Sequence, residues 1–128
     1  MTLEPAQLSE QGRKAFENKK FDEAAELFRQ AGEGYTLGRA GLMAAEMKNN
    51  MSVALLQAGR PQEALDAALG TDQIFESAKD IKRQGMAMGN QAAALEGLNR
   101  FDEAIAVYEI SAQLFAQAGE GDLRSMVM

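Results

Sequence analysis

The chain has 128 residues and a mass of 13.8 kDa, which is enough for one domain with a buried core. Its net charge is −6, and no third of the chain is basic overall, which argues against a nucleic-acid-binding protein. It has no cysteine and no histidine, which removes thiol chemistry, disulfides, the usual zinc ligands and the commonest general base. An enzyme would need a Ser–Lys or paired-carboxylate site, and no predicted helix face brings such groups together. We therefore expect no catalytic residue, no metal site and no cofactor.

The start of the chain and its hydropathy argue against export and against membrane insertion. Glu4 and Pro5 stand where a signal peptide would need basic and then apolar residues. No window approaches 18 consecutive apolar residues, so we expect no membrane-spanning helix. The absence of cysteine fits the cytoplasm, which is the location we expect.

The apolar pattern predicts a first pair of helices within residues 5–36. The first helix runs from about Pro5 to Asn18, with proline at a tolerated first-turn position. Its buried face and that of the second helix carry apolar residues at helical spacing: Leu8, Gly12, Ala15 and Phe16, then Ala24, Phe28, Ala31 and Tyr35. Gly32, Gly34, Gly38 and Gly41 weaken helix at the junction with the next pair.

A second pair is expected within residues 37–77. Its first helix begins near Leu37 to Arg39 and reaches Ala58, with Gly59 as C-terminal cap. Pro61 opens its second helix, where the missing N–H costs nothing, and Gly70-Thr71 weakens that helix at its middle.

A third pair is expected within residues 78–118. Its first helix runs from about Asp80, a plausible N-cap, to Leu98, and its second from Phe101 to Ala118. We expect a break at Gly119-Glu120-Gly121 and then a short C-terminal helical turn over residues 122–128.

The three pairs repeat with a period of 40 residues. Small residues recur in the first helices at Gly12, Ser52 and Ala92, and alanines recur in the second helices at Ala24, Ala64 and Ala104. Aromatic residues follow near the end of each second helix, at Tyr35, Phe75 and Phe115. Small residues on both helices of a pair allow close backbone approach, which favours tight antiparallel hairpins. A fixed period of this size is typical of a repeat array.

These residues resemble the tetratricopeptide repeat. The resemblance is carried by Gly12 with Phe21-Asp22-Glu23-Ala24 and Phe28, and by Ala92 with Phe101-Asp102-Glu103-Ala104 and Tyr108; the middle copy is looser. The family's usual period is 34 residues, so the 40-residue period here resembles its long-helix subclass. The resemblance implies an all-α, right-handed superhelical solenoid of three antiparallel hairpins. It also implies a concave groove, lined by the first helix of each pair, that holds a partner segment.

If Leu8, Gly12 and Ala15 face the core, the groove face lies about one helical step away. We expect partner contact by six residues on that face: Arg13, Glu17, Asn50, Val53, Gln57 and Asn90. The same face holds Glu10, Ala93 and Gly97. The carboxamides of Asn50 and Asn90 can pair with a peptide backbone of any sequence; the alternative is that they are solvated or bonded within the array.

One known use of the family is a carboxylate clamp that grips the C-terminal tails of heat-shock chaperones. This chain offers Ser9, Arg13, Asn50, Met86 and Asn90 at the clamp positions, and only Asn50 matches. The cations that would hold a carboxylate are absent from the third repeat, so we do not expect this clamp. The methionines Met43, Met47, Met51, Met86 and Met88 are expected in the core, with a methionine-lined groove as the alternative.

A second reading makes the chain a self-assembling structural module. Solenoids need a polar cap on the last repeat. The segment after Ala118 is too short and too apolar to cap well, because it includes Leu123, Met126, Val127 and Met128. These residues are candidates for a homodimer contact through the C-terminal hairpin. The other explanation is that the chain is part of a longer array.

Overall fold

The computed structural model describes residues 3–127, with side chains described for residues 3–119. This part of the chain is all-helical, without a strand, which confirms the all-α class. Its helices are α1 (Pro5–Glu17), α2 (Phe21–Leu37), α3 (Gly41–Gln57), α4 (Pro61–Ala68), α5 (Thr71–Ser77), α6 (Ile81–Gly97) and α7 (Phe101–Val127). Within the described residues, none of the helices is both long and apolar enough to cross a membrane.

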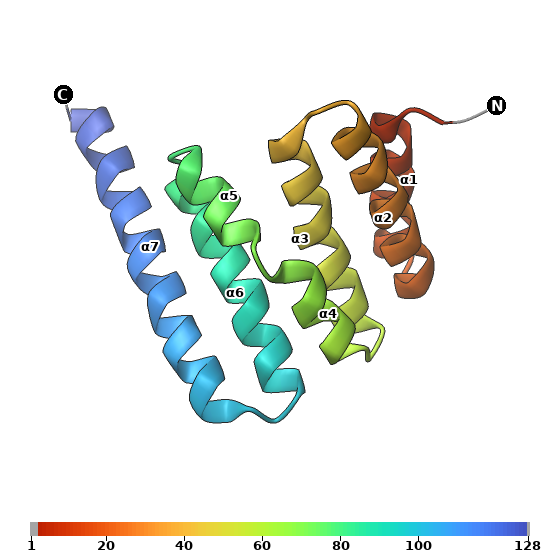
Figure 1. Cartoon of the computed structure of the whole chain (residues 1–128). Coiled ribbons are helices and arrows are strands. Elements are labelled where there is room, and N and C mark those ends of the chain that lie inside the picture. The colour runs from red at the N-terminus through yellow and green to blue at the C-terminus, as the bar shows by residue number, and fades with distance from the viewer. Residues whose placement is uncertain (1–2, 128) are drawn as a thin grey trace.

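The helices pack in chain order. Helix α2 packs between α1 and α3, α3 packs against α4 and α5, α6 packs against α4 and α5, and α7 packs against α6. Figure 1 shows the resulting row, with the α1–α2 pair at one end and α7 at the other. Helices α1, α2 and α3 alternate in direction, and so do α6 and α7, because each is joined to the next by a short turn. Helices α3 and α6 run in the same direction, with α4 and α5 between them.

The same turn recurs every 20 residues. The five residues Lys19, Arg39, Gly59, Lys79 and Asn99 all have φ between 59° and 79°. The residue after each of them donates its N–H to a carbonyl five residues back, at 2.8–2.9 Å. This is the pattern of a Schellman motif, in which a left-handed residue ends one helix and turns the chain into the next. The 40-residue period therefore contains two copies of one helix-and-turn unit.

The turns correct one predicted boundary and confirm two caps. The first helix of the second pair begins at Gly41 and not near Leu37, because α2 continues to Leu37 and Arg39 forms the left-handed turn. Gly59 takes the predicted C-terminal cap position with φ 79°. The Asp80 carboxylate accepts the N–H of Arg83 at 3.1 Å, which confirms the predicted N-cap.

The predicted break after Ala118 is wrong. Helix α7 runs without interruption from Phe101 to Val127, so residues 122–127 continue the helix and form no separate turn. Glycine lowers helix stability by about 1 kcal/mol relative to alanine, but unlike proline it keeps its N–H and causes no clash. Gly119 and Gly121 are therefore tolerated. Met128 lies outside the described residues.

Small residues bring the paired helices together, as the repeat pattern predicts. A Cβ atom added to Gly12 would lie 2.9 Å from the ring of Phe28, so α1 packs directly on that ring. In the second pair, the Ser52 hydroxyl donates to the Ala64 carbonyl at 2.7 Å. In the third pair, Ala92 and Ala104 are buried. These contacts hold each pair at a backbone separation that larger residues would prevent.

The second helix of the middle pair is broken at the predicted weak point. Leu69 has an extended backbone, with ψ 130°, and Gly70 has φ 88°, so α4 ends and α5 begins as a separate helix. The buried Thr71 hydroxyl donates to the Ala68 carbonyl at 2.8 Å and lies 2.9 Å from the Asn49 carboxamide. The break therefore has its own buried polar contacts, since α4 can no longer satisfy its last carbonyls by itself.

Candidate binding groove

Two hollows lie next to each other along α3 and share Asn50. The first has a volume of about 320 Å³ and is lined by α1, α2 and α3. The second has a volume of about 160 Å³ and is lined by α3, α5 and α6. We call the two hollows together the groove. It follows the first helix of each pair, which is the face that the sequence predicts.

The first hollow has apolar walls and a charged rim. Its lining residues are Ser9, Glu10, Arg13, Phe16, Phe28, Asn50 and Val53. The Arg13 guanidinium donates to Glu10, with Nε to Oε2 at 3.1 Å, and also to Glu17. This pairing holds the pKa of the Glu10 carboxyl below its usual range and raises that of Arg13. The arginine charge at this hollow is therefore already neutralised by carboxylates of its own helix.

The second hollow repeats this arrangement with different residues. It is lined by Glu46, Met47, Asn49, Asn50, Phe75, Arg83 and Met86. The Arg83 guanidinium on α6 pairs with Glu46 on α3 and, at 2.8 Å, with Asp80. The hydrogen bonds to Asp80 and then Glu46 raise the pKa of Arg83. The pair with Glu46 also links α3 to α6 across the hollow.

The structure brings together half of the six predicted contact residues. Arg13, Asn50 and Val53 line the first hollow from two helices, and all are exposed. Glu17 reaches it only through its ion pair with Arg13. Gln57, at the end of α3, and the half-buried Asn90 on α6 line neither hollow of the groove.

Two further predictions concern residues away from the groove. Gly97 does not face it, because an added Cβ atom would lie 3.0 Å from Pro61 at the start of α4. The side chains of the predicted dimer contacts lie outside the part of the chain whose side chains are described: Leu123, Met126, Val127 and Met128.

Two charged groove residues were missed by the sequence analysis: Glu46 and Arg83. Glu46 lies four residues before Asn50 and therefore one turn earlier on the same face of α3. Arg83 and Met86 stand on α6 at i−7 and i−4 from Asn90, so the same helical spacing contained the signal. Met47 is buried as expected, whereas Met43 and Met86 are exposed. Met86 therefore favours the alternative of a methionine in the groove.

A larger hollow of about 560 Å³ lies between α2 and α3 and shares Phe28 with the first hollow of the groove. Its lining residues are Phe28, Arg29, Gly32, Glu33, Thr36, Leu37, Lys48 and Met51. Lys48 stands two residues from Asn50, which on a helix places the two side chains about 200° apart. This α2–α3 hollow therefore opens on the opposite side of α3 from the groove.

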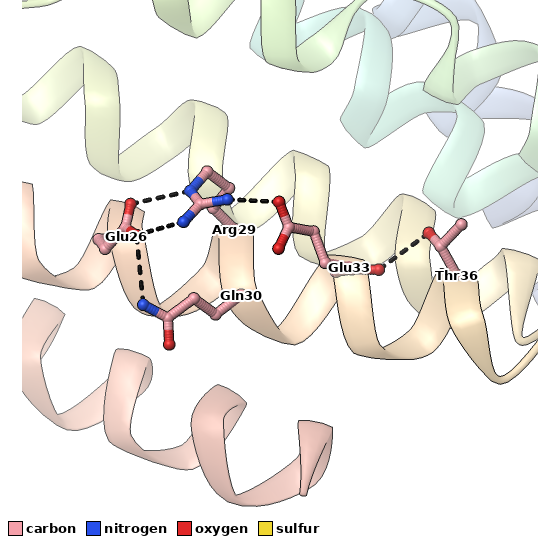
Figure 2. Close-up of polar contacts among 6 residues, drawn as sticks. Glu26, Arg29, Gln30, Glu33 and Thr36 are labelled. Atoms are coloured by element: carbon pink, nitrogen blue, oxygen red, sulfur yellow. Dashed lines mark hydrogen bonds and ion pairs between the residues drawn. The ribbon is translucent and has the colours of Figure 1, made fainter. Parts of the chain in front are cut away.

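Ion pairs along α2 border the α2–α3 hollow. Figure 2 shows Arg29 between Glu26 and Glu33, with Gln30 donating to Glu26 at 3.2 Å and Thr36 to the Gly32 carbonyl at 2.9 Å. The hydrogen bond from Arg29 lowers the pKa of Glu26 to about 2, and that from Gln30 adds to the shift. The carboxylates of Glu26 and Glu33 form hydrogen bonds with side chains of their own helix. The hollow is therefore lined mainly by apolar groups, such as those of Phe28, Leu37 and Met51.

No known protein-family model matches the chain, and no curated protein and no solved structure matches it. Among the described residues, no group of three or more acidic, histidine or cysteine side chains has the arrangement of a metal site. The geometry of the groove is thus what bears on function.

Proposed function

We propose that this protein is a tetratricopeptide-like interaction scaffold that holds a peptide or a helical segment of a partner protein in the groove. In this proposal three pairs form a right-handed superhelical solenoid: α1 with α2, α3 with the broken helix α4 and α5, and α6 with α7. Helices α1, α3 and α6 lie along its concave face. The recurrence of one turn every 20 residues and the packing of each pair of helices on the pair before it support that architecture. We place the protein in the cytoplasm.

The position of Asn50 is the observation that carries the proposal. Its exposed carboxamide stands where the two hollows of the groove meet. A carboxamide offers two donors and an acceptor, so it can pair with the backbone of a bound segment while side chains of that segment enter the hollows. Phe16, Phe28 and Val53 give the first hollow apolar walls, which suits an apolar side chain of the partner.

The charge distribution of the groove favours a partner without a terminal carboxylate anchor. Arg13 and Arg83 are each paired with two carboxylates of the protein itself. A carboxylate of the partner would have to displace these carboxylates from the arginines. The exposed ion pair that it would form in their place contributes little binding energy. We therefore expect recognition by backbone pairing and apolar contact, and not by the carboxylate clamp.

The proposal predicts that Asn50→Ala weakens binding of a groove peptide by about tenfold. The probe is a peptide selected from a displayed random library on the immobilised protein, and its affinity is measured by calorimetric titration. The matched control is Lys48→Ala, which changes an exposed residue of α3 on the side away from the groove.

Both variants should melt within a few degrees of the parent, because the changed side chains are not in the core. Unchanged affinity in Asn50→Ala, or loss of binding in Lys48→Ala alone, would remove the groove as the binding site.

A further inference from the structure

Helix α7 carries an apolar stripe that α6 covers only in part. The Phe115 ring lies 3.4 Å from the position of a Cβ atom added to Gly85, and the Tyr108 hydroxyl donates to Glu96. Four large side chains of the stripe are exposed: Phe101 by 55%, Ile105 by 56%, Tyr108 by 39% and Phe115 by 42%. They stand at i, i+4, i+7 and i+14, which places them on one side of the helix together with the exposed Ala112 and Gly119. We call these six residues the α7 stripe.

The earlier pairs show what normally covers this stripe. The positions 40 and 80 residues before Ile105 are Leu65 and Ala25, and both are buried. The positions before Tyr108 and Phe115 are buried or half-buried as well: Phe28, Ala68, Tyr35 and Phe75. Helix α3 packs on α2, and α6 packs on α4 and α5. Phe28 is also covered by α1, at Gly12. The α7 stripe therefore has the form of a surface that receives another helix.

Two contacts prove the register of this comparison. Gly32 and Asp72 stand 80 and 40 residues before Ala112. A Cβ atom added to Gly32 would lie 3.4 Å from the Cβ of Met47 on α3. The Asp72 carboxylate accepts the Gln91 carboxamide of α6 at 3.0 Å. The position of Ala112 is thus the one that touches the following helix in both earlier pairs.

Helix α1 of another copy of the chain does not have an apolar face that could pack on the α7 stripe as α3 packs on α2. The covering face of α3 holds Ala44, Met47, Met51 and Ala54, and all are buried or half-buried. The residues of the chain 40 positions earlier are polar and exposed: Glu4, Gln7, Gln11 and Lys14. Head-to-tail association of α1 on α7 would bury these polar groups against an apolar stripe, which is costly without partners for them.

We propose that the α7 stripe is covered by the α7 stripe of a second copy of this chain, in an antiparallel symmetric dimer. A two-fold axis near residue 110 places Phe101 opposite Gly119, Tyr108 opposite Ala112 and Ile105 opposite Phe115, in both directions. Two of these three pairings set a large side chain against a small residue, which is how facing helices interdigitate. An interface with this self-complementarity is what a two-fold dimer requires.

One pair of like charges beside the stripe opposes this pairing. Asp102 and Glu109 are exposed and lie next to the stripe on α7. In an antiparallel pair related by a two-fold axis, the same flank of both helices lies on the same side of the interface. Glu109 of one copy therefore lies beside Glu109 of the other, about 3 Å further along the helix axis, and burial of the stripe has to outweigh this exposed like-charge contact. The pairing uses none of the groove residues, and groove binding is therefore independent of it.

The first test is the mass in solution. Sedimentation of the full chain at tens of micromolar should give about twice the monomer mass of 13.8 kDa. Ile105→Asp should raise the dissociation constant by about 100-fold or more, because it places an unpaired charge at the centre of the interface. The control Leu42→Asp changes an apolar residue of α3 that is 49% exposed, and it should leave the dimer unchanged. A monomeric parent, or an Ile105→Asp variant that stays dimeric, would overturn the proposal.

The second test is disulfide cross-linking, which the absence of native cysteines makes clean. Ile105→Cys and Phe115→Cys chains are mixed and oxidised. The antiparallel register predicts a covalent dimer in the mixture and little in either variant alone, because identical positions lie about 15 Å apart along the helix. Efficient cross-linking of each variant with itself would indicate parallel pairing and would also overturn the proposal.

Discussion

At the scale of single residues, four of the five turns place a residue other than glycine in the left-handed conformation, which costs conformational energy. Of the five left-handed turn residues, only Gly59 is glycine, while Lys19, Arg39 and Lys79 have long side chains. A side chain in this region costs roughly 1–2 kcal/mol, because Cβ approaches a carbonyl oxygen. The turns persist because the Schellman hydrogen bonds and the packing of the flanking helices fix the chain there.

Lys79→Gly is therefore expected to stabilise the protein by about 0.5–1 kcal/mol, since the relief of strain exceeds the added entropy of the unfolded chain. The reciprocal variant Gly59→Ala, at the equivalent turn, should destabilise it by about 1 kcal/mol. Urea unfolding followed by circular dichroism measures both. A destabilised Lys79→Gly would show that the lysine side chain supports the turn in another way.

The ion pairs of α2 predict a pH dependence. The pKa of Glu26 is lowered to about 2, chiefly by the hydrogen bond from Arg29. A carboxyl with a lowered folded-state pKa adds stability above its unfolded pKa near 4.5, and this contribution is lost as the pH falls toward 2. Both side chains are about half exposed, with 42% for Arg29 and 51% for Glu26, so solvent screening reduces the contribution to at most about 1 kcal/mol.

In Arg29→Gln the titration midpoint of Glu26, followed by NMR, should rise from about 2 toward the ordinary value of 4.5. The free energy of unfolding should also fall less steeply between pH 5 and pH 2 than in the parent. A Glu26 midpoint that does not move in Arg29→Gln would contradict the assigned ion pair.

At the scale of helices, the break between α4 and α5 is the feature that sets the middle pair apart. Its polar contacts are buried, because Asn49, Thr71 and Gln91 are each at most 8% exposed. Gln91 on α6 donates to Asp72 and approaches the Ala68 carbonyl. Hydrogen bonds therefore connect the break to both neighbouring helices, to α3 through Asn49 and to α6 through Gln91.

Thr71→Val should destabilise the protein by about 1–3 kcal/mol, because it removes the hydroxyl and leaves the Asn49 carboxamide and the Ala68 carbonyl short of a partner. The matched control is Thr36→Val, where an exposed hydroxyl donates to a carbonyl at 2.9 Å and the loss should stay within about 0.5 kcal/mol. Adding Asn49→Leu to Thr71→Val should recover part of the loss. Equal effects of the two valine variants would show that the contacts at the break do not stabilise it.

Helix positions were largely predictable, because apolar spacing and caps act locally. Pro61, Asp80 and Gly59 marked boundaries that the structure reproduces. Arg39 and the glycines after Ala118 misled the prediction for opposite reasons: an arginine takes a conformation that favours glycine, and Gly119 and Gly121 are tolerated inside a helix. Tertiary packing decides such cases, and propensity alone does not contain it.

At the scale of the whole molecule, the sequence predicts which helix face lines the groove but not all of the residues that line it. The face of α1 and α3 with Arg13, Asn50 and Val53 followed from the repeat register. The pairing of Arg83 on α6 with Glu46 on α3 depends on how α6 is placed across the α4–α5 break, and no local pattern specifies that placement. The exposure of the α7 stripe could not be predicted from the repeat pattern either, because the equivalent positions are buried or half-buried in the two earlier pairs.

The central claim is that the concave face is the binding surface, and it is tested most directly by mapping a bound peptide. Backbone amide shifts of the protein are followed by NMR while a library-selected peptide is added. We predict the largest shift changes around Arg13, Asn50 and Arg83, on α1, α3 and α6. Changes concentrated instead on the α7 stripe, or around Lys48 in the α2–α3 hollow, would contradict the claim.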